Sequence, residues 1–296
     1  MNGVLLIDKP TGPTSHDVVA RIRRAANERG IGHTGTLDPR ASGLLPLVLG
    51  KATRLASLLT GSDKTYEATV HLGVTTDTDD ADGVRTGETA LALPDDAAID
   101  DAMAAFRGEI AQVPPAHSAK RIAGKKAYEL ARKSQPVELA PVNVTVRSLV
   151  CVARDGERLE LLVTASAGFY VRALARDLGT RLGCGAHLSA LRRTRSGHFD
   201  VAQALSLAEA ERLGTALAGR LVSPADALPN LSAVQVTPQG LTRVSHGNPV
   251  GPDQLVGHWL PPATAPGPVK ILGPEGHLVA LAQSRGGMLH PGVVLI

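Results

Sequence analysis

Two β-rich runs joined at Asp155-Gly156 constrain the fold more than any other feature of the sequence. The runs VNVTVRSLVCVAR and ERLELLVTAS flank this dipeptide, and Asp-Gly is a preferred turn between the strands of a hairpin. A hairpin makes its two strands antiparallel. Elsewhere, strands and helices interleave without the regular spacing of βαβ units. We therefore expect an α+β fold with a mixed or antiparallel sheet.

The other elements follow from hydrophobic period and turn residues. We expect Ser15 to cap a helix that stops at Gly30, and Asp95 to cap a helix whose apolar residues are spaced by four, three and four up to Ile110. A small β-rich C-terminal domain is expected at 232–296. The remaining expected elements are strands at 4–8, 44–50 and 65–74, helices at 51–61 and 168–183, a proline-broken loop leading into a basic helix within 112–133, and a linker at 223–231.

The charge is unevenly distributed along the chain. Lys and Arg exceed Asp and Glu by four in 1–64 and by eight in 112–200, whereas 65–111 carries two basic against eleven acidic residues. A polyanion responds to such local patches, because screening limits the reach of charges to about 10 Å. The pattern is consistent with nucleic-acid binding and equally with an unevenly charged solvated surface. With three Tyr, three Phe and one Trp, a base-stacking platform of several aromatic rings is excluded.

The cellular compartment is suggested by what the sequence lacks. Cys151 and Cys184 do not make a disulfide framework, and no apolar run approaches the length of a membrane span. The N-terminal apolar run is short and is followed directly by Asp8, unlike a signal peptide. We expect a cytoplasmic protein that does not associate with a membrane.

A polar, glycine-rich loop at 32–43 separates two apolar stretches and carries Asp38. An Asp-Pro turn that caps its own backbone is the structural alternative, but glycines also permit close approach of a ligand, and His33 lies in the same loop. Tyr170 and Arg172 lie two residues apart at an expected strand-to-helix junction. If Arg172 reaches Asp38, the ion pair would keep the carboxylate ionised and oriented.

Motifs for metals and nucleotide cofactors are incomplete in this sequence. Cys184 and His187 form a single C-x-x-H without a second pair, so we expect no zinc site. The acidic run at 77–83 lacks the central glycine and the closing glutamate of a calcium loop. We interpret this run as a solvated or RNA-avoiding loop, and we expect no metal and no cofactor.

Several ordered blocks of the chain resemble one known family. They are GVLLIDKPTGPTSHDVV, GHTGTLDPRASGLLPLVLGKATR, DKTYEATVHLGVTTDTDDADG, QVPPAHSAKRIAGKKAYELAR, GFYVRALARDLGTRLGCGAHLSALRRTRSG and a C-terminal GNPV. In these blocks the chain resembles the bacterial tRNA pseudouridine-55 synthases, the TruB family. The match runs nearly end to end. It departs at His117, where the family pattern has tyrosine.

The resemblance implies a catalytic set of three residues. Asp38 is implied to be the nucleophile and Arg172 to pair with it, while Tyr66 stacks on the flipped uracil. Tyr66 is also placed to help remove the C5 proton, a hypothesis that phenylalanine at this position would test. Taken alone, Tyr66 in an alternating strand is a core residue and Arg172 a surface cation.

The resemblance also implies substrate-binding residues beside the catalytic set. Tyr170 and Leu191 are implied to line the base pocket together with Tyr66, and His33 to support the opened T-loop. The alternative readings are a hairpin anchor for Tyr170 and a core position for Leu191. Lys9 matches the family as well, and we interpret it as a structural brace for the Asp38 loop.

The implied organisation is a pseudouridine synthase catalytic domain at 1–228, with an insert at about 65–135, and a PUA-like RNA-binding domain at 229–296. The implied function is isomerisation of uridine to pseudouridine at position 55 in the T-loop of tRNAs, by a monomer without a protein partner. A non-enzymatic alternative is a folding chaperone that opens the T-loop of tRNA. A third is the core of a guide-RNA-dependent synthase, which requires partners.

Overall fold

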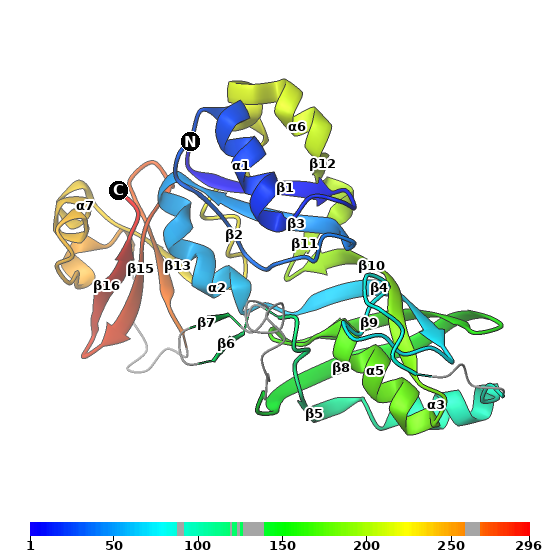
Figure 1. The fold of residues 1–296 in the computed structure, drawn as a ribbon. Helices are drawn as coiled ribbons and strands as arrows, with labels where there is room; N and C mark the ends of the chain where they lie inside the picture. Colours follow the sequence, from blue (N-terminus) through cyan, green and yellow to red (C-terminus); the bar gives the residue numbers. More distant parts are fainter. Residues whose placement is uncertain (88–91, 119, 123–124, 127–138, 258–266) are drawn as a thin grey trace.

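A long mixed sheet forms the centre of the molecule (Figure 1). The computed structural model describes residues 1–87, 92–118, 120–122, 125–126, 139–257 and 267–296. The path through the ten-stranded sheet is β12 (Leu205–Ser206), β1 (Gly3–Lys9), β3 (Ser42–Leu49), β10 (Ala186–Ser196), β4 (Lys64–Leu72), β9 (Arg158–Ala165), β8 (Val142–Asp155) and β5 (Gly108–Gln112), with β2 (Ile31–His33) on β3 and β11 (Phe199–Asp200) on β10. The expected α+β fold is confirmed.

The hairpin at Asp155-Gly156 is formed by β8 and β9, as expected. Gly156 has a φ of 57°, which suits the turn. Most neighbouring strands are antiparallel, but β10 runs parallel to β3 and brings Arg193 opposite Gly43. A Cβ at Gly43, whose φ is 99°, would lie 2.2 Å from the Arg193 carbonyl oxygen. Only glycine permits this approach at the centre of the sheet.

Helices cover the sheet at both ends (Figure 1). At one end, α1 (Ser15–Ala26) and α6 (Leu207–Leu213) pack on β1 and β3. At the other end, α3 (Asp96–Ala104) and α5 (Val171–Leu182) pack on β4, β8 and β9. The short helix α2 (Ala56–Thr60) follows a 3₁₀ turn at Gly50–Leu55 and leads into β4. Among the described residues, no helix has both the length and the apolar character needed to cross a membrane.

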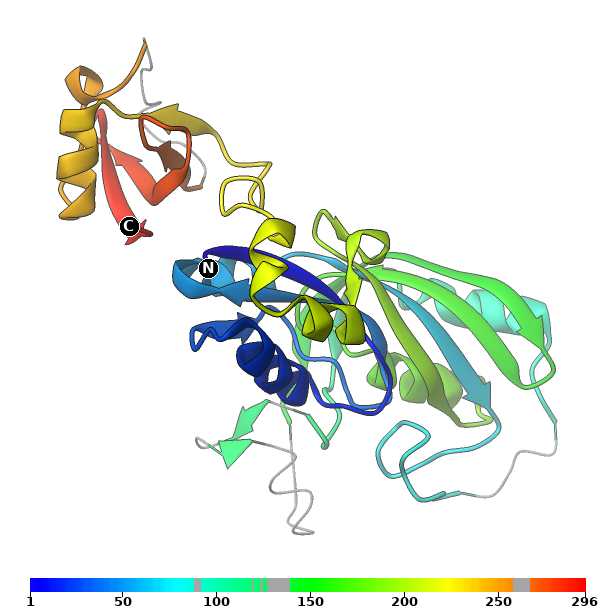
Figure 2. The same cartoon turned by 90° about the horizontal axis from the view of Figure 1, so that it is seen from above.

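The C-terminal sheet consists of β13 (Ala233–Gln235), β14 (Val269–Leu272), β15 (Leu278–Arg285) and β16 (Met288–Val294), with α7 (Pro238–Ser245) beside it. It lies at the end of the molecule away from β8 and β9 (Figure 2). The alternation of side chains between the two faces of β1 explains how the C-terminal sheet is attached. Leu5 and Ile7 enter the core under α1, whereas Val4 and Leu6 enter a core shared with the C-terminal sheet.

Three expected element boundaries are wrong. The cap of α1 is Thr14, which forms a capping box with Asp17, because the Ser15 side chain bonds the backbone of another segment. The same helix ends at Asn27, in the left-handed conformation, before Gly30. Asp95 does cap α3, but the helix ends at Ala104, and the residues after it form β5. Most of the expected basic helix within 112–133 lies outside the described residues; β6 (Arg121–Ile122) and β7 (Lys125–Lys126) pair within this range.

Candidate active site

The Asp38 loop, residues 34–41 between β2 and β3, is held through its backbone on one side. The Nζ of Lys9 donates to the carbonyl oxygens of Pro39 at 3.2 Å and Ala41 at 2.7 Å. Ser15, at the start of α1, accepts from the Leu37 amide at 2.8 Å and donates to the Leu37 carbonyl at 3.0 Å. Lys9 is fully buried. These contacts fix the loop on both sides of Asp38, and they agree with the interpretation of Lys9 as a brace.

Arg172 holds the carboxylate of Asp38 from the other side. Its Nε lies 3.0 Å from Oδ2 and its Nη2 3.3 Å from Oδ1, a two-point contact. Arg172 is the second residue of α5, whose cap residue is Tyr170. Its side chain is 7 % exposed, against 40 % for Asp38. The guanidinium is therefore fixed inside the protein, while the carboxylate reaches an open space.

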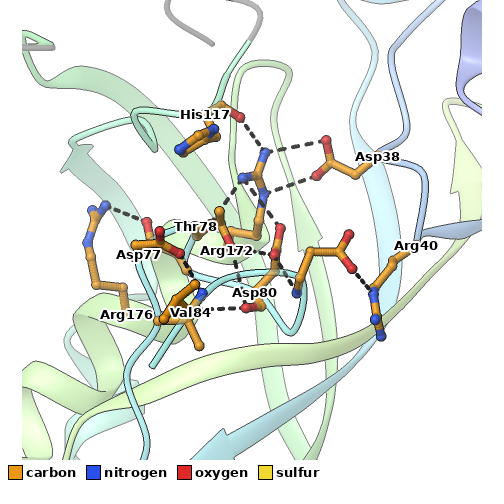
Figure 3. Close-up of polar contacts among 12 residues, drawn as sticks. Asp38, Arg40, Asp77, Thr78, Asp80, Val84, His117, Arg172 and Arg176 are labelled. Carbon is orange, nitrogen blue, oxygen red and sulfur yellow. Dashed lines mark hydrogen bonds and ion pairs between the residues drawn. The ribbon is translucent and has the colours of Figure 1, made fainter. Parts of the chain in front are cut away.

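The acidic run contributes to this ion-pair cluster (Figure 3). Arg172 Nη1 donates to the Thr78 carbonyl at 3.2 Å and lies 3.6 Å from the Asp80 carboxylate. Arg176, one turn further along α5, pairs with Asp79 at 3.0 Å. The side chains of Asp79 and Asp80 are 15 % and 18 % exposed. The expectation of a solvated loop is therefore wrong for these two residues, because two arginines from a distant helix neutralise them.

A pocket of about 300 Å³ opens above Asp38. Tyr66 from β4, Tyr170 and Arg172 from the start of α5, and Leu191 from β10 all line it. The remaining lining residues are Gly35, Thr36, Leu37, Thr60, Lys64, Ser118, Ser166, Ala167, Gly168, Phe169, Val171 and Arg193. Flat aromatic and aliphatic walls above one carboxylate suit a planar ring attached to a sugar.

His33 is not among the residues that line the pocket. Its Nδ1 accepts a long hydrogen bond, 3.4 Å, from the Gly35 amide, so the ring supports the entry into the Asp38 loop. Burial lowers the pKa of His33, and the charges of Arg193 and His16 lower it further. His117, which stands where the family pattern has tyrosine, contacts the site through its backbone. Its carbonyl oxygen accepts a hydrogen bond from Arg172 Nη2 at 2.9 Å.

The electrostatics of the site are dominated by burial. Burial raises the pKa of Asp38 above its ordinary value; the nearby Arg172 opposes this rise, whereas Asp80 adds to it. Burial also lowers the pKa of Lys9 to about 8 and that of Lys64 to about 8. Arg172 therefore favours the ionised carboxylate, as its contact with Asp38 predicts, but it does not fully offset burial, and the pKa of Asp38 stays above its ordinary value.

Two buried cations of the pocket were not anticipated from the sequence. Arg193, 1 % exposed, donates to the carbonyl oxygens of Leu44 at 2.7 Å and Gly35 at 3.0 Å. Burial lowers the pKa of Arg193, and a hydrogen bond with the Tyr66 side chain opposes the shift. Lys64 is 5 % exposed. The sequence could have indicated Lys64, because it lies two residues before Tyr66 in β4 and residues two apart share one face of a strand. No cluster of three metal-ligating side chains occurs in the described part of the chain.

Sequence and structure comparisons identify the family. Residues 23–171 match the TruB family pseudouridylate synthase N-terminal domain, and 172–228 match the tRNA pseudouridylate synthase B C-terminal domain. The tRNA pseudouridine synthase B of Thermobifida fusca is 42 % identical over 302 residues, covering 99 % of this chain and 98 % of that protein. That of Solibacter usitatus is 42 % identical over 300 residues, covering both chains fully.

Two solved structures share the whole fold. A Cbf5-Nop10-Gar1 complex contains a chain with a TM-score of 0.74 and 28 % identity, covering 99 % of this chain and 85 % of that one. An H/ACA ribonucleoprotein bound to a substrate RNA contains another, with a TM-score of 0.73, 27 % identity and the same coverage. Together with the matched domains and the full-length relatives, they lead to one conclusion: the chain belongs to the TruB family of pseudouridylate synthases.

Proposed function

We propose that the protein converts uridine to pseudouridine at position 55 in the T-loop of tRNAs, with the target base flipped into the Asp38 pocket. The observation that carries this proposal is the two-point contact of Arg172 with Asp38 beneath walls formed by Tyr66, Tyr170 and Leu191. The full-length relatives are named tRNA pseudouridine synthase B, which supports tRNA as the substrate.

The proposed reaction is an isomerisation. The bond between N1 and C1′ breaks, the uracil turns, and a bond between C5 and C1′ forms while the C5 hydrogen leaves as a proton and N1 gains one. No atom is supplied from outside. A carboxylate next to the sugar stabilises or traps a cation-like C1′, as in glycoside cleavage. Asp38 is the nucleophile of this proposal, and Tyr66 assists removal of the C5 proton.

Flipping the uridine costs a few kcal/mol, because stacking and pairing in the T-loop are lost. One stack on an aromatic side chain returns about 1–3 kcal/mol. We propose that phosphate contacts from the basic 112–200 segment supply the remainder, and that the C-terminal sheet acts as a PUA-like RNA-binding domain. Affinity for tRNA should then fall steeply with salt, because counterions are released on binding.

The test uses purified protein, an unmodified tRNA transcript and its isolated T-arm hairpin, with no cofactor or partner protein added. Pseudouridine is located by carbodiimide treatment and reverse-transcription stops, for the wild type and for Asp38→Asn. We expect one stop, at the T-loop uridine, that disappears in Asp38→Asn while tRNA binding persists. Tight, salt-sensitive binding by the wild type without any stop would leave the T-loop chaperone or the partner-dependent core as the explanation.

A further inference from the structure

One polar side chain of the pocket is buried without a close hydrogen-bond partner. The Oγ of Ser118 has no partner within 3.5 Å among the described residues, and Ser118 is 3 % exposed. Its contact is with the Tyr170 side chain, whose pKa it lowers against the rise caused by burial. Ser118 also lines the Asp38 pocket. A buried hydroxyl without a partner lowers stability, because its hydrogen bonds to water are lost and not replaced. Such a group in a binding pocket is explained when the ligand provides the missing partner.

The segment that carries Ser118 is attached to α5 at three points. The Gln112 side chain bonds both backbone groups of Tyr170, at 3.1 and 2.8 Å. Arg176 donates to the Val113 carbonyl at 2.9 Å, and Arg172 to the His117 carbonyl at 2.9 Å. Because Arg172 also holds Asp38, the position of Ser118 is tied to that of the reactive carboxylate. Ser118 is therefore held in the wall of the pocket.

The chemistry of the pocket narrows the identity of the missing partner. The cations that line it already donate to the protein: Lys64 to the carbonyls of Thr60 and Ser62, and Arg193 to those of Gly35 and Leu44. The Ser118 hydroxyl, in contrast, is a donor that is not occupied by a carbonyl oxygen of the protein. A flat ring between Tyr66 and Leu191 presents polar atoms only at its edge. In uracil these are two carbonyl oxygens and the N3 proton.

We propose that the Ser118 hydroxyl recognises the target uracil by donating a hydrogen bond to one of its carbonyl oxygens. This inference rests on the proposed function, since it requires uracil in the Asp38 pocket. Ser118 forms no covalent bond in the reaction. It acts as a specificity and positioning residue for the base.

The symmetry of uracil makes a hydroxyl suitable for both halves of the reaction. A half-turn about the axis through N3 and C6 exchanges N1 with C5 and also exchanges O2 with O4. A donor that meets one carbonyl oxygen before the base turns therefore meets the other afterwards. A fixed hydroxyl can thus hold the detached base against the sugar in either orientation, without moving itself.

The experiment is a double-mutant cycle between Ser118 and the base. Synthetic T-arm hairpins carry uridine, 2-thiouridine or 4-thiouridine at the target position, because sulfur is a weaker hydrogen-bond acceptor than oxygen. For Ser118→Ala we expect kcat/KM on the uridine hairpin to fall about tenfold, the loss of one hydrogen bond. At least one thio substitution should slow the wild type severalfold yet leave Ser118→Ala unaffected. Ser118→Cys, whose thiol is a weak donor, should behave like Ser118→Ala.

Ser166 is the matched control, because it lines the same pocket but is satisfied within the protein. Its Oγ accepts from the Thr145 amide at 2.9 Å. Ser166→Ala should lower the melting temperature, whereas Ser118→Ala should keep or raise it. The inference is overturned if both thio effects are as large in Ser118→Ala as in the wild type, or if Ser118→Ala retains full kcat/KM. Failure of the proposed function is a separate result, in which the wild type forms no pseudouridine in the uridine hairpin.

Discussion

The two sides of the Asp38 loop are each held by a buried cation, but by different chemistry. On the backbone side, Lys9 donates hydrogen bonds to neutral carbonyl oxygens; burial lowers its pKa to about 8, and the charge of Asp38 opposes this shift. On the carboxylate side, Arg172 meets two carboxylates, those of Asp38 and Asp80. The difference teaches that Lys9 mainly sets the shape of the loop, whereas Arg172 is the main influence that opposes the rise in the pKa of Asp38, with a smaller contribution from Lys9. Variants on either side should therefore fail in different ways.

The largest effect is expected for Arg172→Gln. Breaking a buried ion pair lowers the free energy of unfolding by about 3–5 kcal/mol. For Arg172→Gln we expect the lower end of this range, about 3 kcal/mol, because the partner side chain, Asp38, is 40 % exposed. Burial of Asp38 would then be less opposed, so the acid limb of the pH–rate profile should move to higher pH. Urea unfolding and single-turnover rates between pH 5 and 9 check both. An unchanged acid limb would separate Arg172 from the ionisation of Asp38.

Lys9→Met tests the backbone side and should have a smaller effect. It leaves the carbonyls of Pro10, Pro39 and Ala41 without their common donor, which should cost about 1–3 kcal/mol in urea unfolding. The acid limb of the pH–rate profile should move to higher pH, but by less than in Arg172→Gln, because Lys9 lowers the pKa of Asp38 less than Arg172 does and the Arg172–Asp38 pair is retained. A shift as large as that of Arg172→Gln would show that the two cations influence the pKa of Asp38 equally.

The pH dependence of stability sharpens the same contrast. The pKa of Lys9 falls from 10.5 in the unfolded chain to about 8 in the fold, so between these values the unfolded state binds more protons. Stability from this group therefore rises with pH from about 8 towards 10.5. We expect the stability advantage of the wild type over Lys9→Met to grow between pH 8 and pH 10. Lys64, whose pKa is also about 8, is common to both proteins and cancels in the difference.

The smallest effect is expected at an exposed ion pair. Arg147 lies 3.2 Å from Asp63, but their side chains are 56 % and 42 % exposed. Solvent-exposed pairs contribute about 0–1 kcal/mol, so Arg147→Ala should change the urea unfolding midpoint only slightly. A loss comparable to that of Arg172→Gln would mean that burial does not govern the strength of these ion pairs.

Local pattern predicts the fold well where one rule acts alone. The hairpin at Asp155-Gly156 and the strand at β4 follow from alternation and turn chemistry, and tertiary contacts do not alter them. The predicted cap of α1 is wrong because two adjacent residues, Thr14 and Ser15, are both good caps. The contact of Ser15 with Leu37 decides between them. Sequence pattern alone does not contain this contact.

The residues of the site can be predicted where a residue type is unusual for the kind of segment that carries it. Asp38 in a glycine-rich loop and Arg172 at a junction stand out, and the structure brings them together. Asp79 and Asp80 do not stand out, because an acidic run is normally solvated and their partners lie about a hundred positions away. Arg193 is missed for a related reason. Its carbonyl partners are set by the β3–β10 crossing, which local periodicity does not report.

The shared core between β1 and the C-terminal sheet bears on how such a chain evolves. Val4 and Leu6 pack in one cluster with Leu278 and Leu281 of β15. Loss of the C-terminal sheet would uncover these side chains and leave an apolar surface prone to aggregation. The sheet is therefore not a freely exchangeable module. A lineage that discards it must also change the first strand of the protein, more than two hundred residues away in the gene.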